Sequence, residues 1–205
     1  MTYQRKDAHY RRAKAQGFRA RSAYKLAELD DRYRLLRKGD RVVDLGAWPG
    51  GWLQVALERV GSSGRLVGVD LVLIEPLPAR NVELLVGDVR EAGVQTRIVE
   101  LLGGLADVVL SDVAPKLTGV RDVDDARCAE AFAAVAAALP ALLRPGGRAL
   151  VKIFMDAQYR ENVSRLRTLF DDVAATRPDT SRRGSAELYA IARGFRGNAP
   201  AVDNL

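Results

Sequence analysis

Cysteine and histidine are nearly absent from this sequence of 205 residues, which holds one of each. The single cysteine, Cys128, cannot form a disulfide within the chain, and one histidine with one cysteine cannot supply the ligand set of a zinc or iron site. We therefore expect chemistry without a protein-bound metal. The fold must be stabilised by an apolar core, for which 48% hydrophobic residues are sufficient.

Long apolar runs are also missing. The longest, from Ala129 to Leu143, is mostly alanine, is interrupted by Glu130 and Pro140, and is too short to cross a bilayer. No basic leader followed by an apolar stretch is visible. The sequence therefore predicts a soluble, cytoplasmic protein without a membrane segment, and the alanine-rich run predicts a packed helix.

Positive charge is concentrated at the start of the chain. Residues 1–25 hold eight Lys or Arg and one acid, Asp7, for a formal charge of +7, whereas the whole chain carries +6. Residues 26–205 therefore sum to −1, and the excess charge indicates a polyanionic partner for one segment. Rings that could stack on bases lie between these charges, at Tyr3, His9, Tyr10 and Phe18. We predict that residues 1–18 are a basic RNA-binding arm; the alternative is a solubilising tail.

Strand-like and helix-like stretches alternate over the rest of the chain. Strands are expected at Arg41–Leu45, Arg65–Asp70, Val82–Val86, Asp107–Leu110, Ala149–Phe154 and Leu188–Ala192. Helices are expected at Trp52–Val60, Val94–Leu102, Ala126–Leu143 and Tyr159–Phe170. This alternation predicts an α/β fold with a mostly parallel sheet covered by helices on both faces.

Two local signals refine these boundaries. Ser22 is a candidate N-cap for a further helix that begins at Ala23, and Arg144-Pro145-Gly146-Gly147 is expected to end one helix and turn into the next strand. No repeat or linker divides the chain. We predict one domain over residues 19–196 and a C-terminal tail over residues 197–205.

A glycine-rich turn follows the first predicted strand, at the position where open α/β sheets bind ligands. It runs from Asp44 to Trp52 and places glycines at 46, 50 and 51. A dinucleotide fingerprint has the spacing Gly-x-Gly-x-x-Gly, which cradles a pyrophosphate, so the spacing counts against NAD or FAD. It matches the Asp-x-Gly-x-x-Pro-Gly-Gly form of a methyltransferase cofactor loop.

Two further acids follow neighbouring strands. Asp70 ends the second predicted strand and Asp88 comes just after the third. Either acid alone is more often a turn or cap residue, but their appearance at successive strand ends favours a ligand site. By the geometry of such sheets, Asp70 would accept hydrogen bonds from ribose hydroxyls and Asp88 would face the adenine amino group.

From Arg19 to Phe195 the sequence resembles the FtsJ/RrmJ-like (RlmE-type) family of RNA 2′-O-ribose methyltransferases. The resemblance rests on five motifs in the family's order: Arg21 to Leu26, Asp44 to Trp52, Ser111 to Lys116, Val151 to Phe154, and Arg182 to Tyr189. It implies a Rossmann-like class I methyltransferase fold with a seven-stranded sheet. It also implies S-adenosyl-L-methionine as cofactor, with S-adenosyl-L-homocysteine as product.

The family's site residues transfer to matching positions. Its catalytic Lys-Asp-Lys-Glu tetrad falls on Lys25, Asp112, Lys152 and Glu187, and its cofactor contacts fall on Gly50, Trp52, Asp70, Asp88 and Asp112. One departure is Trp48, where relatives commonly have alanine. Either the indole points away from the cofactor or the pocket has a different shape here.

The implied reaction is an in-line displacement in which a ribose oxygen attacks the methyl group of a sulfonium. The leaving group needs no acid, so the enzyme has to position both substrates and manage one proton. Lys152 could accept that proton or orient the hydroxyl. Lys25 adds a like charge, which favours a neutral Lys152, whereas Asp112 and Glu187 favour its ammonium form, so both roles stay open.

The substrate that the resemblance implies is a uridine of 23S ribosomal RNA in the large subunit, presented from an unpaired or splayed loop to a monomeric enzyme. Phosphate contacts are expected from the arm and from Arg182, Arg183, Arg193 and Arg196. Two alternatives remain: a transfer RNA 2′-O-ribose methyltransferase, and a non-catalytic RNA-binding ribosome-assembly factor. A small-molecule methyltransferase is disfavoured by the arm, and a NAD-dependent dehydrogenase by the loop spacing.

Overall fold

A computed structural model describes residues 15–115, 118–181 and 184–197 of the chain. Most of the predicted arm (residues 1–14), two of the arginines predicted to contact phosphate (Arg182 and Arg183) and nearly all of the predicted tail (residues 198–205) lie outside these ranges. Within them, no helix is long and apolar enough to cross a membrane.

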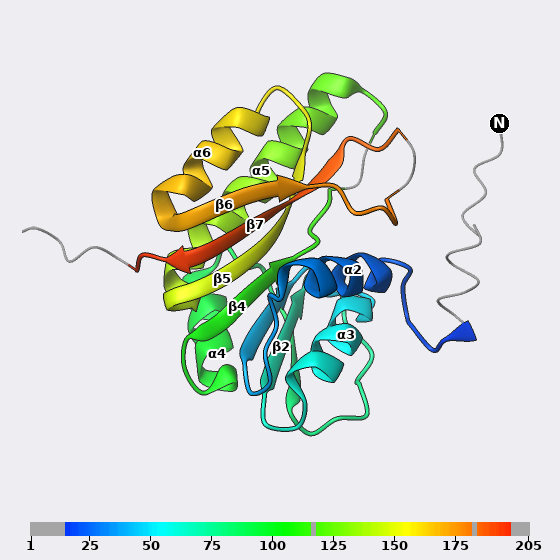
Figure 1. Ribbon diagram of the computed structural model, residues 1–205, viewed down its shortest axis with the longest axis vertical. Helices are drawn as coiled ribbons and strands as arrows, with labels where there is room; N and C mark the ends of the chain where they lie inside the picture. The colour runs from blue at the N-terminus through cyan, green and yellow to red at the C-terminus, as the bar shows by residue number, and fades with distance from the viewer. Residues whose placement is uncertain (1–14, 116–117, 182–183, 198–205) are drawn as a thin grey trace, which may run out of the picture.

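The described residues form one seven-stranded sheet with the strand order β3-β2-β1-β4-β5-β7-β6 (Figure 1). The strands are β1 (Arg41–Leu45), β2 (Arg65–Asp70), β3 (Val82–Val86), β4 (Ala106–Ser111), β5 (Leu143–Phe154), β6 (Phe170–Thr176) and β7 (Glu187–Phe195). Strands β1 to β5 run parallel, and β7 is antiparallel to both β5 and β6. The predicted mostly parallel α/β sheet is confirmed.

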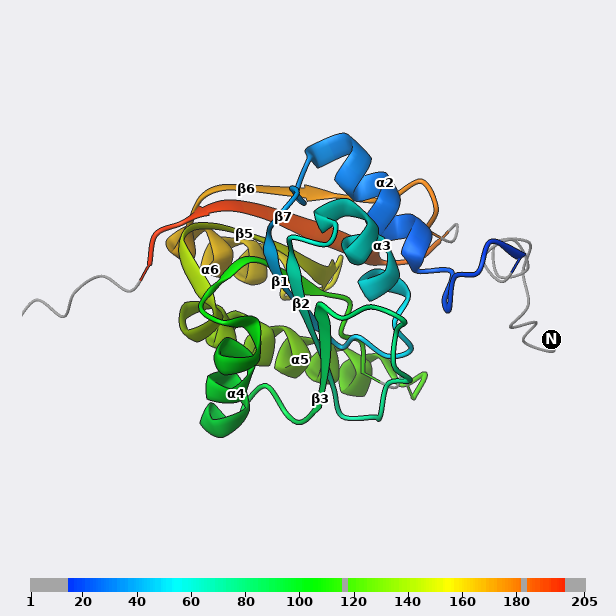
Figure 2. The same cartoon turned by 90° about the horizontal axis from the view of Figure 1, so that it is seen from below.

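Helices cover both faces of this sheet (Figure 2). They are α2 (Ala23–Tyr33), α3 (Gly51–Val60), α4 (Ala92–Leu102), α5 (Arg121–Leu142) and α6 (Tyr159–Leu169). Helices α2 and α3 lie on one face, and α4, α5 and α6 lie on the other. Each face therefore buries its own apolar layer.

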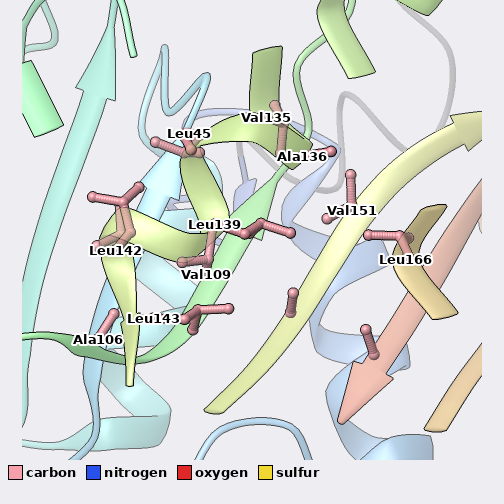
Figure 3. Close-up of a cluster of buried hydrophobic side chains, with 14 of the residues drawn as sticks. Leu45, Ala106, Val109, Val135, Ala136, Leu139, Leu142, Leu143, Val151 and Leu166 are labelled. Atoms are coloured by element: carbon pink, nitrogen blue, oxygen red, sulfur yellow. The ribbon is translucent and has the colours of Figure 1, made fainter. Parts of the chain in front are cut away.

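Successive side chains of a strand point to opposite faces of a sheet, and this alternation separates the two layers. In β1, Val43 and Leu45 pack beneath α4 and α5, whereas Val42 packs beneath α2 and α3. The layer under α5 joins Leu139 and Leu142 of that helix to the central strands (Figure 3). Because both faces are covered, the central strands read as continuous apolar runs in the sequence.

Two local predictions were wrong, and one strand was not predicted. The sequence from Arg144 to Gly147 does not separate a helix from a strand, because β5 begins at Leu143 directly after α5 and a shift in its pairing with β4 accommodates the extra residues. Ser22 does precede α2, but its side chain makes no capping hydrogen bond, since its backbone is already helical. Strand β6 was not expected from its sequence.

Candidate active site

Side-chain alternation in β5 and β7 brings the candidate catalytic residues to one face of the sheet. In β5, Val151 and Ile153 face the layer under α5, so Lys152 between them faces α2. Lys152 pairs in register with Tyr189, and Phe154 pairs with Glu187. Glu187 therefore lies diagonally across from Lys152 on the same face, within reach of a lysine side chain.

Asp112 enters this cluster from the residue that follows β4. The Nζ atom of Lys152 lies 2.7 Å from Oδ1 of Asp112 and donates to the Asp112 carbonyl at 3.1 Å. It also lies 3.6 Å from Oε2 of Glu187. Lys152 is 8% exposed, so these two carboxylates face a lysine that is almost withdrawn from solvent.

Lys25 reaches the cluster from α2, which buries Ala23, Leu26 and Leu29 against the sheet. Its ammonium forms an ion pair with Oε1 of Glu187 and lies 3.5 Å from the Tyr189 hydroxyl. The structure thus brings together all four residues predicted as a tetrad, from α2, β5, β7 and the loop after β4.

Tyr189 belongs to the same cluster, although its own role was not predicted from the sequence. Its hydroxyl donates to Oδ1 of Asp112 at 2.6 Å and lies 3.2 Å from Oε1 of Glu187. Burial, together with the negative charges of Asp112 and Glu187, raises the pKa of Tyr189 well above its ordinary value, so the hydroxyl keeps its proton and remains a donor. The available signal was its spacing, because residues two apart in a strand share a face.

The cluster balances two cations against two anions. Burial raises the pKa of Glu187, but the charges of Lys152 and Lys25 outweigh burial, and the net pKa of Glu187 is below its ordinary value. Glu187 is therefore ionised at neutral pH. It fixes the positions of the two lysines relative to each other, because each lies against a different oxygen of one carboxylate.

A cavity of about 640 Å³ opens next to Lys152, a volume typical of sites for small molecules and cofactors. Its lining includes Asp70, Asp88 and Asp112 as well as Lys152. The opposite wall comes from α5. The acids predicted at successive strand ends thus converge on one cavity.

Gly50 and Trp52, predicted as cofactor contacts, are placed differently. Both are buried, and neither is among the described residues that line the cavity. The Trp52 indole donates to the Ser22 carbonyl at 2.8 Å and packs on the Tyr189 ring, with 5.8 Å between centroids. In this structure Trp52 therefore contacts the residue before α2 and the tyrosine of the catalytic cluster. Its contact with a cofactor stays a prediction.

Gly46 provides the close approach that the glycine-rich turn requires. Its φ of +76° lies in the left-handed region, and a Cβ atom there would meet the Val113 side chain at 2.7 Å and its backbone at 3.2 Å. The end of β1 can therefore lie against the segment after β4, where both line the cavity.

The carboxylate of Asp88 is hydrogen-bonded to Arg90. Its Nε lies 3.1 and 2.9 Å from the two carboxylate oxygens of Asp88, and its NH1 reaches Glu130 of α5 at 2.9 Å. These hydrogen bonds from Arg90 lower the pKa of Asp88. Asp88 is thus an ionised acceptor that shares its oxygens with an arginine paired with Glu130 of α5, and its contact with adenine stays a prediction.

Asp44 is the most unusual group near the cavity. Its side chain is fully buried in β1, and neither carboxylate oxygen has a hydrogen-bond partner among the described residues. Burial first, and then the charges of Asp112 and Asp70, raise the pKa of Asp44 well above its ordinary value. The raised pKa favours the neutral form of Asp44, and a positively charged ligand nearby would shift the group towards its carboxylate.

Arg193 and Arg196, predicted to contact phosphate, lie elsewhere. Since β7 runs antiparallel to β5, they lie at the opposite end of the sheet from Lys152. Arg193 donates to the Tyr33 carbonyl at 2.7 Å, and Arg196 pairs with Asp171 at 3.1 Å. These arginines stabilise the fold there and are remote from the cavity.

The strand order, the antiparallel β7 and a cavity at the carboxyl ends of the parallel strands define a class I methyltransferase fold. A sequence model of the family described as "FtsJ-like methyltransferase" matches residues 18–195. The chain belongs to this family.

Relatives and solved structures agree with this assignment. A Methanothrix thermoacetophila protein named "Ribosomal RNA large subunit methyltransferase E" is 46% identical over 193 residues, covering 94% of this chain and 74% of that protein. The Methanobrevibacter smithii protein of the same name is 39% identical over 190 residues, covering 93% and 90%.

Among solved structures, a Plasmodium falciparum protein described as a ribosomal RNA methyltransferase has a TM-score of 0.77 at 28% identity, covering 88% of this chain and all of that one. An Aeropyrum pernix fibrillarin, solved with bound S-adenosyl-L-methionine, has a TM-score of 0.56 at 19% identity, covering 77% and 68%. The fibrillarin likeness supports the fold alone.

Proposed function

We propose that this protein transfers the methyl group of S-adenosyl-L-methionine to the 2′-hydroxyl of a ribose in RNA, specifically a uridine of 23S ribosomal RNA. The observation that carries the proposal is the buried cluster of Lys25, Asp112, Lys152 and Glu187 at the edge of a cavity of cofactor size. The names of the relatives support an RNA target in the large ribosomal subunit. The product would be S-adenosyl-L-homocysteine.

The residues around the cavity suit this cofactor. Asp70 and Asp88 offer carboxylate oxygens to hydroxyl and amino groups, and a cation bound near the partnerless Asp44 would favour the ionised form of that carboxyl. When bound, S-adenosyl-L-methionine supplies a methyl group on a sulfonium, a cation that matches this negative region. Asp112 also lines the cavity, whereas the proposed contacts of Gly50 and Trp52, which are not among its described lining residues, rest on the sequence resemblance alone.

The tetrad would place the ribose. Lys152 can donate to the attacking oxygen, while Asp112 and Glu187 keep its amine in one position. Tyr189 fixes Asp112 in turn, and Lys25 fixes Glu187. Methyl transfer to that oxygen would release the hydroxyl proton, which the amine of Lys152 would accept if it is neutral, and the carboxylate of Asp112 or Glu187 would accept if Lys152 is an ammonium. Holding the reactants in line supplies much of the rate of such a transfer.

One assay tests the proposal directly. The protein is incubated with S-adenosyl-L-methionine carrying a labelled methyl group and with large ribosomal subunits, free ribosomal RNA or transfer RNA, and the labelled nucleotide is mapped. We expect label on one uridine 2′-oxygen of 23S ribosomal RNA. Label on transfer RNA would support the first alternative, and the absence of label from every RNA would support a non-catalytic assembly factor.

Replacing Asp44 by Asn is predicted to stabilise the protein and at the same time to weaken cofactor binding. Because the folded protein raises the pKa of Asp44, ionised Asp44 destabilises the cofactor-free fold as the pH rises above about 4. Asp44→Asn should therefore raise the melting temperature, by an amount that grows from pH 4 to pH 8. It should also weaken cofactor binding, by up to about tenfold at the high-pH end of this range, where Asp44 is ionised and attracts the cation by about 1 to 2 kcal/mol.

Thermal melts and titration calorimetry measure the two effects. The matched control is Asp172→Asn, at a carboxylate of β6 that is 61% exposed and remote from the cavity, which should change stability by less than about 0.5 kcal/mol. Destabilisation of Asp44→Asn would mean that the carboxyl group of Asp44 has a stabilising partner in the fold. An unchanged cofactor affinity would mean that Asp44 does not contribute to cofactor binding.

We further propose that residues 1–18 bind RNA phosphates, that residues 19–196 form a single catalytic domain followed by a tail at 197–205, and that the protein acts as a cytoplasmic monomer. The sequence supports the arm through its charge, since residues 1–14 carry five Lys or Arg against one acid.

Deleting residues 1–14 leaves every described residue in place and is predicted to weaken RNA binding while flattening its salt dependence. For single-stranded RNA, the slope of log K against log salt should fall by about 0.7 for each phosphate that the shortened protein no longer neutralises. Fluorescence anisotropy of a labelled RNA between about 50 and 200 mM salt measures the slope. An unchanged slope would identify the segment as a solubilising tail.

A further inference from the structure

Four exposed apolar residues lie in the two loops that reach the cavity after β1 and β2, and the site described above does not use them. We call them the apolar rim: Trp48 is 58% exposed, Leu71 69%, Val72 53% and Leu73 77%. Trp48 and Leu71 line the same cavity as Lys152. Clustered apolar groups on the surface of a soluble protein mark a place where a ligand or partner binds.

The rim is built from two loops that Asp70 joins. The backbone N–H of Trp48, in the loop after β1, donates to Oδ2 of Asp70 at 2.9 Å. The backbone N–H of Val72, in the loop after β2, donates to Oδ1 at 3.0 Å. One carboxylate therefore holds the two halves of the rim side by side.

Arg19 holds the same two loops from the N-terminal side. Its guanidinium donates to the carbonyl of Pro49, next to Trp48, at 3.3 Å, and to the carbonyls of Glu75 and Pro76 at 2.5 and 2.7 Å. The rim is thus fixed before any ligand arrives, which lowers the entropic cost of binding. In the sequence, Arg19 belongs to residues 1–25, which carry a formal charge of +7.

We propose that the apolar rim stacks an unpaired nucleobase of the RNA, with the indole of Trp48 as the main platform, while the neighbouring ribose lies at Lys152. This inference rests on the function proposed above. An aromatic face held by Arg19, which belongs to the most basic part of the sequence, fits a ligand with flat bases and a charged backbone better than an apolar peptide or lipid. Every base has a π-face, so the rim selects unpaired over paired nucleotides and does not read sequence.

Tryptophan fluorescence gives a direct test, because the chain has only two tryptophans and Trp52 is 3% exposed. Full-length protein without cofactor is titrated with a single-stranded RNA oligonucleotide of the target region. We expect the oligonucleotide to quench the wild-type emission. Trp48→Phe should abolish the quenching, because the remaining tryptophan is buried.

Affinity for a labelled oligonucleotide, measured by anisotropy without cofactor, tests the energetics. Trp48→Ala should bind about tenfold more weakly, which is within the range for removal of one stacked base, whereas Trp48→Phe keeps a ring and should stay within about threefold of wild type. Trp48→Ala should keep the wild-type slope of log K against log salt, since stacking releases no counterions. A duplex of the same sequence should show no difference between wild type and Trp48→Ala.

A second pair of variants tests the rim away from the cavity lining. Leu73→Ala should weaken binding about threefold. The matched control is Leu105→Ala, at a leucine that is 37% exposed and precedes β4 at the opposite end of the strands, and its binding should equal that of wild type.

Equal affinities for wild type and Trp48→Ala, or quenching that persists in Trp48→Phe, would overturn the proposal. So would quenching by S-adenosyl-L-methionine but not by RNA, which would make the rim part of the cofactor site. Failure of the function proposed above has a different signature, because wild-type protein would then label no RNA, whatever the oligonucleotide affinities show.

Discussion

Lys152→Ala should lose methyl transfer by about 10²- to 10⁴-fold while the protein stays folded and still binds cofactor. That range is typical for removal of a positioned proton-transfer or donor group. Lys152 is the one residue of the cluster that both lines the cavity and contacts two carboxylates, Asp112 and Glu187. Its removal leaves those carboxylates facing the ribose oxygen, where they repel the charge that develops as the methyl group is transferred.

Single-turnover labelling of the RNA measures the rate, and calorimetry measures cofactor binding. Lys38→Ala is the matched control, because Lys38 is exposed in the turn before β1 and lies at the opposite end of the strands from the cavity. It should transfer methyl at the wild-type rate. Equal rates for Lys152→Ala and Lys38→Ala would mean that the catalytic centre lies elsewhere.

The central strands could be predicted from the sequence because each is buried on both faces. Strands β1 and β2 have the bounds expected from their buried apolar runs, and so does the edge strand β3, whose apolar residues are interrupted only by Glu83. Strand β6 could not be predicted from the sequence. It is an edge strand that begins with Phe170, followed by two exposed acids, Asp171 and Asp172. Its place in the sheet comes from antiparallel pairing with β7, and no local pattern records a tertiary contact of this kind.

Some features of the candidate site could likewise be predicted from the sequence, and others could not. The acids at strand ends were predictable because parallel strands end at one edge, so Asp70, Asp88 and Asp112 meet in the cavity. The interaction partners of these carboxylates could not be predicted, because the partners come from distant segments of the sequence. Arg90 on Asp88 and the lack of any described partner for Asp44 are visible only in three dimensions.

Arg148→Ala should lower the free energy of unfolding by about 3 to 5 kcal/mol, the usual result of breaking a buried ion pair. Arg148 is 5% exposed in β5. Its NH2 lies 3.0 and 2.9 Å from the two oxygens of Asp40, and its NH1 donates to the Leu35 carbonyl at 2.5 Å. For a domain of this size, the melting temperature should fall by about 6 to 20 °C.

The control is Arg144→Ala, four residues earlier in the same strand, where the partner is Asp107 and the arginine side chain is 48% exposed. This surface pair should contribute at most about 1 kcal/mol. Chemical denaturation at several pH values gives a further check. Burial raises the pKa of Asp40 even with Arg148 present, so without the arginine its carboxylate is a buried charge that only protonation relieves.

The free-energy loss in Arg148→Ala should therefore be largest at neutral pH and shrink towards pH 4, because a raised pKa costs stability only above its unfolded value. The double variant Arg148→Met with Asp40→Asn should regain much of the stability, since it removes both charges and keeps a similar volume. A destabilisation in Arg148→Ala that does not depend on pH would mean that packing of the arginine side chain, and not its charge, stabilises this end of the sheet.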